Sequence, residues 1–111
     1  MSDTLHDILT KAVSEYRSIF GSALVQVILY GSYARGDYDS ESDIDIVALV
    51  RCDRETISDK TNALGKLSSD LDLMYGIMVS PSAIPFDEYL KYQNDLPYYA
   101  NIAKEGVELI A

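Results

Sequence analysis

A Gly-Ser turn, followed at a short distance by two carboxylates, limits what this chain can fold into more than any other feature. Gly31 and Ser32 directly follow the apolar segment 24–30, which predicts a strand that ends in this turn. The free backbone N–H groups of such a turn can face an anion, and a glycine lets the backbone approach it closely. Ten residues then separate Ser32 from Asp43, so an anion site is predicted shortly before an acidic one.

The acidic site consists of Asp43 and Asp45, which alternate with Ile44 and Ile46. Side chains alternate between the two faces of a strand, so both carboxylates are expected on one face, with Cα atoms roughly 7 Å apart. The two isoleucines are expected in a core on the other face. Carboxylate oxygens suit divalent cations, so Asp43 and Asp45 are predicted metal ligands.

The hydrophobic pattern predicts a mixed α/β chain. Residues 5–16 carry apolar side chains at steps of three and four, which is typical of an amphipathic helix. We expect a strand at 24–30, a brief helix at 32–35 that ends at Gly36, and a second strand that contains the two acids.

The second half of the chain is predicted to cross back to the sheet. A helix over 53–71 would lead to a third strand at 72–79. Pro81 and Pro85 are expected to end this pattern, and a last helix is predicted over 97–104.

Length and charge exclude several classes of function. The 111 residues suit one domain, 1–111, and no apolar segment approaches the roughly 18 residues that span a membrane, so no membrane partner is expected. The net charge of −9 argues against direct nucleic-acid binding, which rests on clustered Lys and Arg. The N-terminus lacks a basic segment followed by an apolar one, so we expect no signal peptide and a cytoplasmic location. Cys52, the only cysteine, is interpreted as a bystander thiol.

The motifs Gly31-Ser32 and Asp43-x-Asp45, within GSYARG and SDIDIVAL, resemble those of the nucleotidyltransferase superfamily that includes DNA polymerase beta. The chain is most similar, along its whole length, to the smallest branch, the minimal nucleotidyltransferases (MNT). This resemblance implies a small mixed sheet of three to four strands flanked by helices. It also implies two Mg²⁺ ions and transfer of a nucleoside monophosphate from a nucleoside triphosphate to a hydroxyl group.

The resemblance assigns roles to individual residues. Asp43 and Asp45 would be the catalytic metal ligands, while Gly31 and Ser32 would anchor the phosphates of the nucleotide. Arg35 has two possible roles, because a guanidinium binds phosphates and carboxylates with similar geometry. It either contacts phosphate or pairs with an acid of the following loop, and the sequence leaves both open.

Small members of this branch are paired with HEPN-type toxins. The resemblance therefore implies an antitoxin that transfers AMP from ATP to a tyrosine of a HEPN ribonuclease partner. The acidity of the chain suits a basic protein partner. Two alternatives stay open, namely an antitoxin that neutralises its partner by contact alone and a stand-alone transferase with a small-molecule acceptor.

The family usually carries a third acid on the next strand. The expected register of the strand at 72–79 places Gly76 where that carboxylate belongs. Asp72 would lie on the same face, but four residues along a strand span about 13 Å, too far to replace the acid without a register shift. We therefore expect a metal site with one ligand fewer, and activity that is slow or absent.

Overall fold

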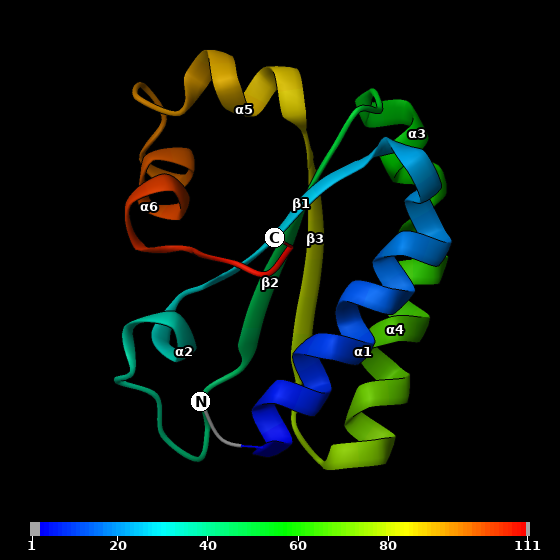
Figure 1. Cartoon of the computed structure of the whole chain (residues 1–111), viewed down its shortest axis with the longest axis vertical. Helices are drawn as coiled ribbons and strands as arrows, with labels where there is room; N and C mark the ends of the chain where they lie inside the picture. Colours follow the sequence, from blue (N-terminus) through cyan, green and yellow to red (C-terminus); the bar gives the residue numbers. More distant parts are fainter. Residues whose placement is uncertain (1–2, 111) are drawn as a thin grey trace.

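The computed structural model describes residues 3–110 and shows a four-stranded mixed sheet between two groups of helices (Figure 1). The strand order is β3-β2-β1-β4. The elements are α1 (Asp3–Phe20), the 3-10 turn η1 (Gly21–Ala23), β1 (Leu24–Tyr30), α2 (Ser32–Arg35), β2 (Ile44–Val50), α3 (Arg54–Asp59), α4 (Thr61–Tyr75), β3 (Val79–Pro85), α5 (Phe86–Tyr92), α6 (Pro97–Glu105) and β4 (Val107–Glu108).

Strand β2 lies at the centre of the arrangement that positions the site. It is antiparallel to β1 and parallel to β3, and α3 and α4 form the crossover that this parallel pair requires. In this register Asp45 lies beside Tyr30 on one neighbouring strand and beside Ser80 on the other.

Two hydrophobic cores form, one on each face of the sheet. On the first face, α1 and α4 cover Ile44 and Ile46, which are fully buried as the alternation with Asp43 and Asp45 predicts. The apolar stripe of α1 is also confirmed, with Ile8, Ala12 and Tyr16 inaccessible to solvent. On the second face, α5 and α6 cover a smaller core: Ile28, Val47, Leu49, Ile84, Tyr89, Tyr99 and Ile102. Asp45 belongs to this second face, because it shares the parity of Val47 and Leu49.

The prediction of a single helix over 53–71 and a strand at 72–79 is wrong. Two helices, α3 and α4, occupy the segment, and α4 continues to Tyr75 because Leu67 and Leu71 extend a buried helical stripe. Gly76 then adopts the left-handed conformation (φ 68°) and donates its backbone N–H to the Asp72 carbonyl at 2.7 Å, which is a helix C-cap.

The third strand, β3, covers the proline-containing segment, where the sequence predicted that the strand pattern would end. Pro81 and Pro85 lie within β3, which is the edge of the sheet, and an edge strand tolerates residues that lack an N–H donor. Helix α5 and strand β4 were not predicted, whereas the last helix is confirmed as α6. No helix within residues 3–110 is long and apolar enough to cross a lipid bilayer.

Candidate nucleotide and metal site

The turn after β1 brings Gly31 directly against the carboxylate of Asp45. Gly31 has φ 75° and ψ −156°, a conformation that is essentially restricted to glycine. A Cβ atom added there would lie only 2.7 Å from Asp45 Oδ2. A side chain at position 31 would displace the carboxylate, so the predicted anion turn and the predicted acid lie directly against each other.

Helix α2 begins at this turn and presents its first N–H groups there. The Gly31 carbonyl accepts hydrogen bonds from the N–H groups of Ala34 and Arg35, both at 3.1 Å, so the donors of Ser32 and Tyr33 precede the first bonds of the helix. Within the described chain, no side chain caps this N-terminus. Gly36, at φ 84°, ends the helix as predicted.

The two acids lie at the start of β2 and differ in exposure. Asp43 is exposed and precedes the strand, whereas Asp45 is half-buried. Partial burial raises the pKa of Asp45, and the negative charge of Asp43 raises it further.

The donor set of the site fits magnesium. No group of three or more His, Cys, Asp or Glu side chains suited to a metal ion occurs within residues 3–110, which leaves Asp43 and Asp45 as a pair. Magnesium prefers oxygen ligands and is commonly held by one or two carboxylates together with substrate phosphates. A carboxylate pair beside an anion turn provides that combination.

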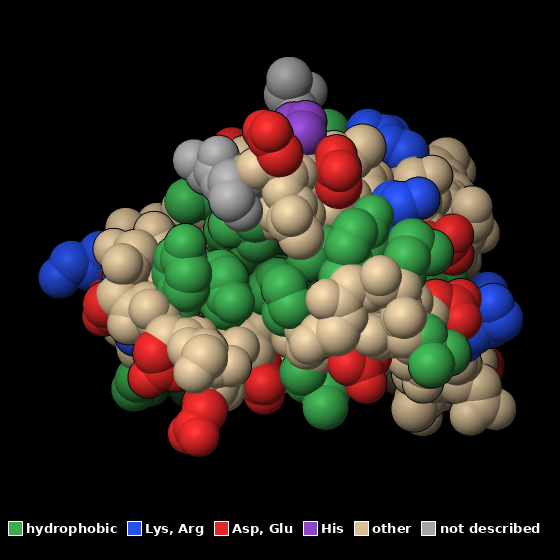
Figure 2. Space-filling model, turned by 90° about the horizontal axis from the view of Figure 1, so that it is seen from below, with side chains coloured by type: hydrophobic (Ala, Val, Ile, Leu, Met, Phe, Trp, Pro, Cys, Tyr) green, Lys and Arg blue, Asp and Glu red, His purple; other side chains and the backbone are tan. Residues whose placement is uncertain are grey.

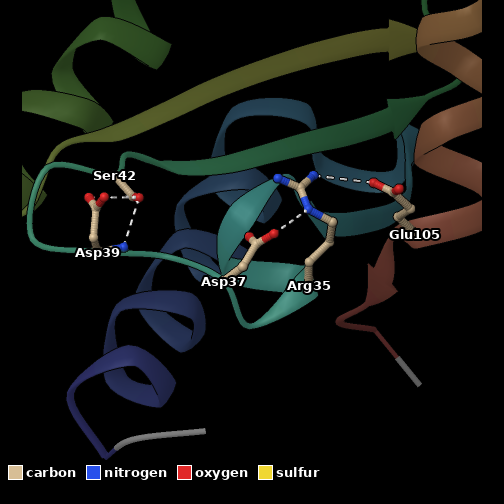
Figure 3. Close-up of polar contacts among 5 residues, drawn as sticks. All are labelled: Arg35, Asp37, Asp39, Ser42 and Glu105. Carbon is tan, nitrogen blue, oxygen red and sulfur yellow. Dashed lines mark hydrogen bonds and ion pairs between the residues drawn. The ribbon is translucent and has the colours of Figure 1, made fainter.

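Arg35 is paired with acids, as one of its two predicted roles requires. Its Nε atom lies 3.1 Å from an Asp37 carboxylate oxygen, and its guanidinium also reaches Glu105 of α6 at 3.3 Å (Figure 3). These ion pairs join α2, the following loop and α6. A phosphate contact by Arg35 would compete with both carboxylates.

The loop before Asp43 is held by its own polar groups. The Asp39 N–H donates to Ser42 Oγ at 3.0 Å, and the Ser42 hydroxyl donates to the Asp39 carboxylate at 3.3 Å (Figure 3). The rings of Tyr33 and Tyr38 stack with centroids 4.1 Å apart, which fastens the loop to α2. The position of Asp43 relative to the turn is therefore fixed at both ends of the loop.

The predicted position of the third acid is wrong. Gly76 caps α4, and Asp72 lies in the exposed part of that helix, on the opposite face of the sheet from Asp45. The residue of β3 that lies beside Asp45 is Ser80, with Ser82 two positions further on the same face. The alternation of Ser80 and Ser82 with Val79, Pro81 and Ala83 is the local pattern that the sequence analysis did not use.

Hydroxyl groups gather on the face of the sheet that carries Asp45. The hydroxyls of Tyr30 and Tyr98 are 3.0 Å apart. Burial raises the pKa of Tyr30 most, the Tyr98 hydroxyl and the charge of Asp45 raise it further, and the Ser82 hydroxyl lowers it. Tyr30 therefore remains a neutral phenol beside the acid.

Tyr16 of α1 contacts the backbone of Ser82 from the first face of the sheet. Its hydroxyl donates to the Ser82 carbonyl at 2.8 Å and accepts the Ser82 N–H at 3.1 Å, which satisfies a fully buried phenol. Burial raises the pKa of Tyr16, so it too stays protonated. The sequence pattern of α1 identified Tyr16 only as a core residue.

Comparison with known proteins agrees with this geometry. A family model described as the nucleotidyltransferase domain matches residues 9–105. The chain belongs to this family. Two relatives from Methanocaldococcus jannaschii, MJ0141 and MJ0604, are described as candidate protein adenylyltransferases. MJ0141 is 40% identical over 75 residues, which cover 68% of this chain and 74% of the relative. MJ0604 is 31% identical over 100 residues, which cover 86% of this chain and 92% of the relative.

Solved structures confirm the nucleotidyltransferase fold. A chain of a toxin–antitoxin crystal structure with AMP-PNP has a TM-score of 0.61 and 21% identity, over 92% of this chain and 72% of that one. A chain of the complex between the tri-AMPylated Shewanella oneidensis HEPN toxin and its MNT antitoxin has a TM-score of 0.56 and 18% identity, over 96% and 71%. The predicted small mixed sheet flanked by helices is therefore correct.

Proposed function

We propose that this chain is a magnesium-dependent adenylyltransferase that transfers AMP from ATP to a tyrosine of a HEPN-type protein and thereby acts as its antitoxin. The observation that supports this most is the close approach of the Gly31 turn to the Asp45 carboxylate, which brings the predicted anion turn next to the predicted acid pair. The names of the two relatives support AMP transfer to protein, and the HEPN toxin in one structural neighbour supports the partner.

The residues of the site have distinct roles in this reaction. The N–H groups of Ser32 and Tyr33, with the Ser32 hydroxyl, would bind the phosphates beyond the reacting one. Asp43 and Asp45 would hold Mg²⁺, which when bound neutralises phosphate charge and lowers the pKa of the acceptor hydroxyl. Gly31 would let the backbone approach the phosphates closely, and any side chain at this position would push the Asp45 carboxylate out of place.

An exposed apolar surface supports an acceptor on another protein. Leu73, Met74 and Met78, around the C-terminal end of α4, are 87%, 57% and 51% exposed. Hydrophobic side chains gather in the middle of the face at this end of the molecule (Figure 2). Contiguous exposed apolar side chains are typical of protein interaction sites, and a small-molecule acceptor would not require them.

The test is co-expression of the chain with a HEPN-type protein, followed by mass spectrometry of that partner. Wild type is expected to add AMP to a partner tyrosine, and Asp43→Asn/Asp45→Asn is expected to add none. Asp72→Asn is the matched control, because it removes a carboxylate from the opposite face of the sheet. Transfer that survives in the double variant, or that Asp72→Asn abolishes, would refute the assignment of the site.

Ser80 beside Asp45 favours one second candidate, an antitoxin that acts by contact alone. The strand position next to the acid pair carries a hydroxyl instead of a third carboxylate, which leaves less charge to hold a metal. In the same co-expression experiment, this candidate predicts that wild type and Asp43→Asn/Asp45→Asn both silence the partner and that neither adds AMP.

A further inference from the structure

A tyrosine of α6 lies on the face of the sheet that carries Asp45, beside Tyr30 of β1. Tyr98 lies in the first turn of α6, and its hydroxyl is 3.0 Å from the hydroxyl of Tyr30. Tyr30 is the register partner of Asp45. A phenol from a helix distant in sequence is thereby placed next to the strand position of the half-buried acid.

Tyr98 and its neighbour Tyr99 have different environments. Tyr99 is 5% exposed, and its hydroxyl donates to Glu88 at 2.7 Å and accepts from Arg54 at 3.0 Å, so it serves the core and the surface ion pair. Tyr98 is 45% exposed. Within the described chain, the hydroxyl of Tyr30 is the only polar partner of the Tyr98 hydroxyl. The fold therefore makes little use of the Tyr98 hydroxyl beyond this one hydrogen bond, and the side chain is partly open to solvent.

We propose that Tyr98 is an acceptor for AMP within its own chain, an inference that rests on the proposed function. Tyr98 Oη attacks the α-phosphorus of ATP and forms a new O–P bond. The bond from that phosphorus to the oxygen that bridges to the β-phosphate breaks, and pyrophosphate leaves. The phenolic proton passes to water. The product carries AMP on Tyr98, where it excludes a second acceptor.

The test is mass spectrometry of the purified chain after incubation with ATP and Mg²⁺. We expect the mass of one AMP to be added and to map to Tyr98 within the tryptic peptide 92–104. Tyr98→Phe is expected to lose this modification. Tyr92→Phe is the matched control in the same peptide, because Tyr92 packs at the edge of the second core. The Tyr92→Phe variant is expected to keep the AMP on Tyr98. An unmodified Tyr98, or AMP on another tyrosine in its place, overturns the proposal.

Two further arms separate the possible failures. Incubation of wild type with Asp43→Asn/Asp45→Asn, which retains Tyr98, tests transfer between copies. AMP found only on the wild-type chain supports transfer within one chain. AMP found on the double variant overturns transfer within one chain. A co-expressed HEPN-type partner is analysed in parallel. AMP on the partner with none on Tyr98 overturns this inference alone, whereas AMP on neither overturns the proposed adenylyltransferase as well.

Discussion

Replacing Gly31 by alanine should destabilise the fold through the same contact that defines the site. An L-residue held at φ 75° and ψ −156° costs about 1–3 kcal/mol, because this region is sparsely populated by residues with a side chain. The added Cβ would also lie 2.7 Å from Asp45 Oδ2, so the carboxylate must move. For a domain of this size, each kcal/mol lowers Tm by about 4 °C, which gives an expected loss of about 4–12 °C.

Gly36→Ala is the matched control for backbone strain. Gly36 also has a positive φ, 84°, but a Cβ added there meets no atom within 4 Å. Its replacement should cost about 1 kcal/mol, the penalty for a left-handed alanine, without a contribution from a clash. Gly31→Ala should therefore be the more destabilising of the two in metal-free thermal denaturation.

A double-mutant cycle isolates the clash with Asp45. If the carboxylate contact contributes, the cost of Gly31→Ala should be at least about 0.5 kcal/mol smaller in an Asp45→Ala background than in wild type. Urea denaturation of the four proteins measures this coupling. Additive costs in the cycle would show that the Gly31 turn and Asp45 do not interact, and the argument for a joint site would fail.

Three further perturbations test other parts of the structure. Because the pKa of Asp45 is raised in the folded state, ionisation of Asp45 destabilises the fold. Asp45→Asn should therefore be more stable than wild type at neutral pH in urea denaturation. This gain in stability should vanish below the ordinary carboxyl pKa of 3.8. Tyr99→Phe loses the hydrogen bonds to Glu88 and Arg54 and should cost about 1 kcal/mol in the same assay. Gly76→Asp should lower Tm slightly and leave Mg²⁺ affinity unchanged in calorimetry, whereas Ser80→Asp should tighten it; the reverse order would contradict the β3 register.

The first half of the chain could be predicted because local signals there agree with the final packing. The segment 24–30 is strand β1, and residues 32–35 are helix α2, with the boundaries that the apolar run and the two flanking glycines indicate. The alternation of acids and isoleucines around Ile44 is likewise a local pattern that the sheet preserves. What the sequence did not contain is the approach of the Gly31 backbone to Asp45, which depends on the β1–β2 register.

The second half could not be predicted to the same extent because long-range pairing overrides its local signals. The apolar residues at 73–78 read as a strand, but α4 continues to Tyr75 until Gly76 supplies a left-handed cap. Prolines normally end strands, yet Pro81 is tolerated because β3 has a free edge. The sequence left two roles for Arg35, because one of its partners, Glu105 of α6, is 70 positions away in sequence.

The absence of a third acid follows from the register of β3. The Ile44 N–H donates to the Met78 carbonyl at 2.9 Å, which fixes where the parallel pair begins and places Ser80 beside Asp45. Two carboxylates attract a divalent cation less strongly than three, so under the proposed function the triphosphate must supply more of the ligand oxygens. Metal and nucleotide should then stabilise each other's binding. Burial raises the pKa of Tyr16 and Tyr30, so these two phenols stay protonated and add hydrogen-bonding groups near Asp45 without adding charge.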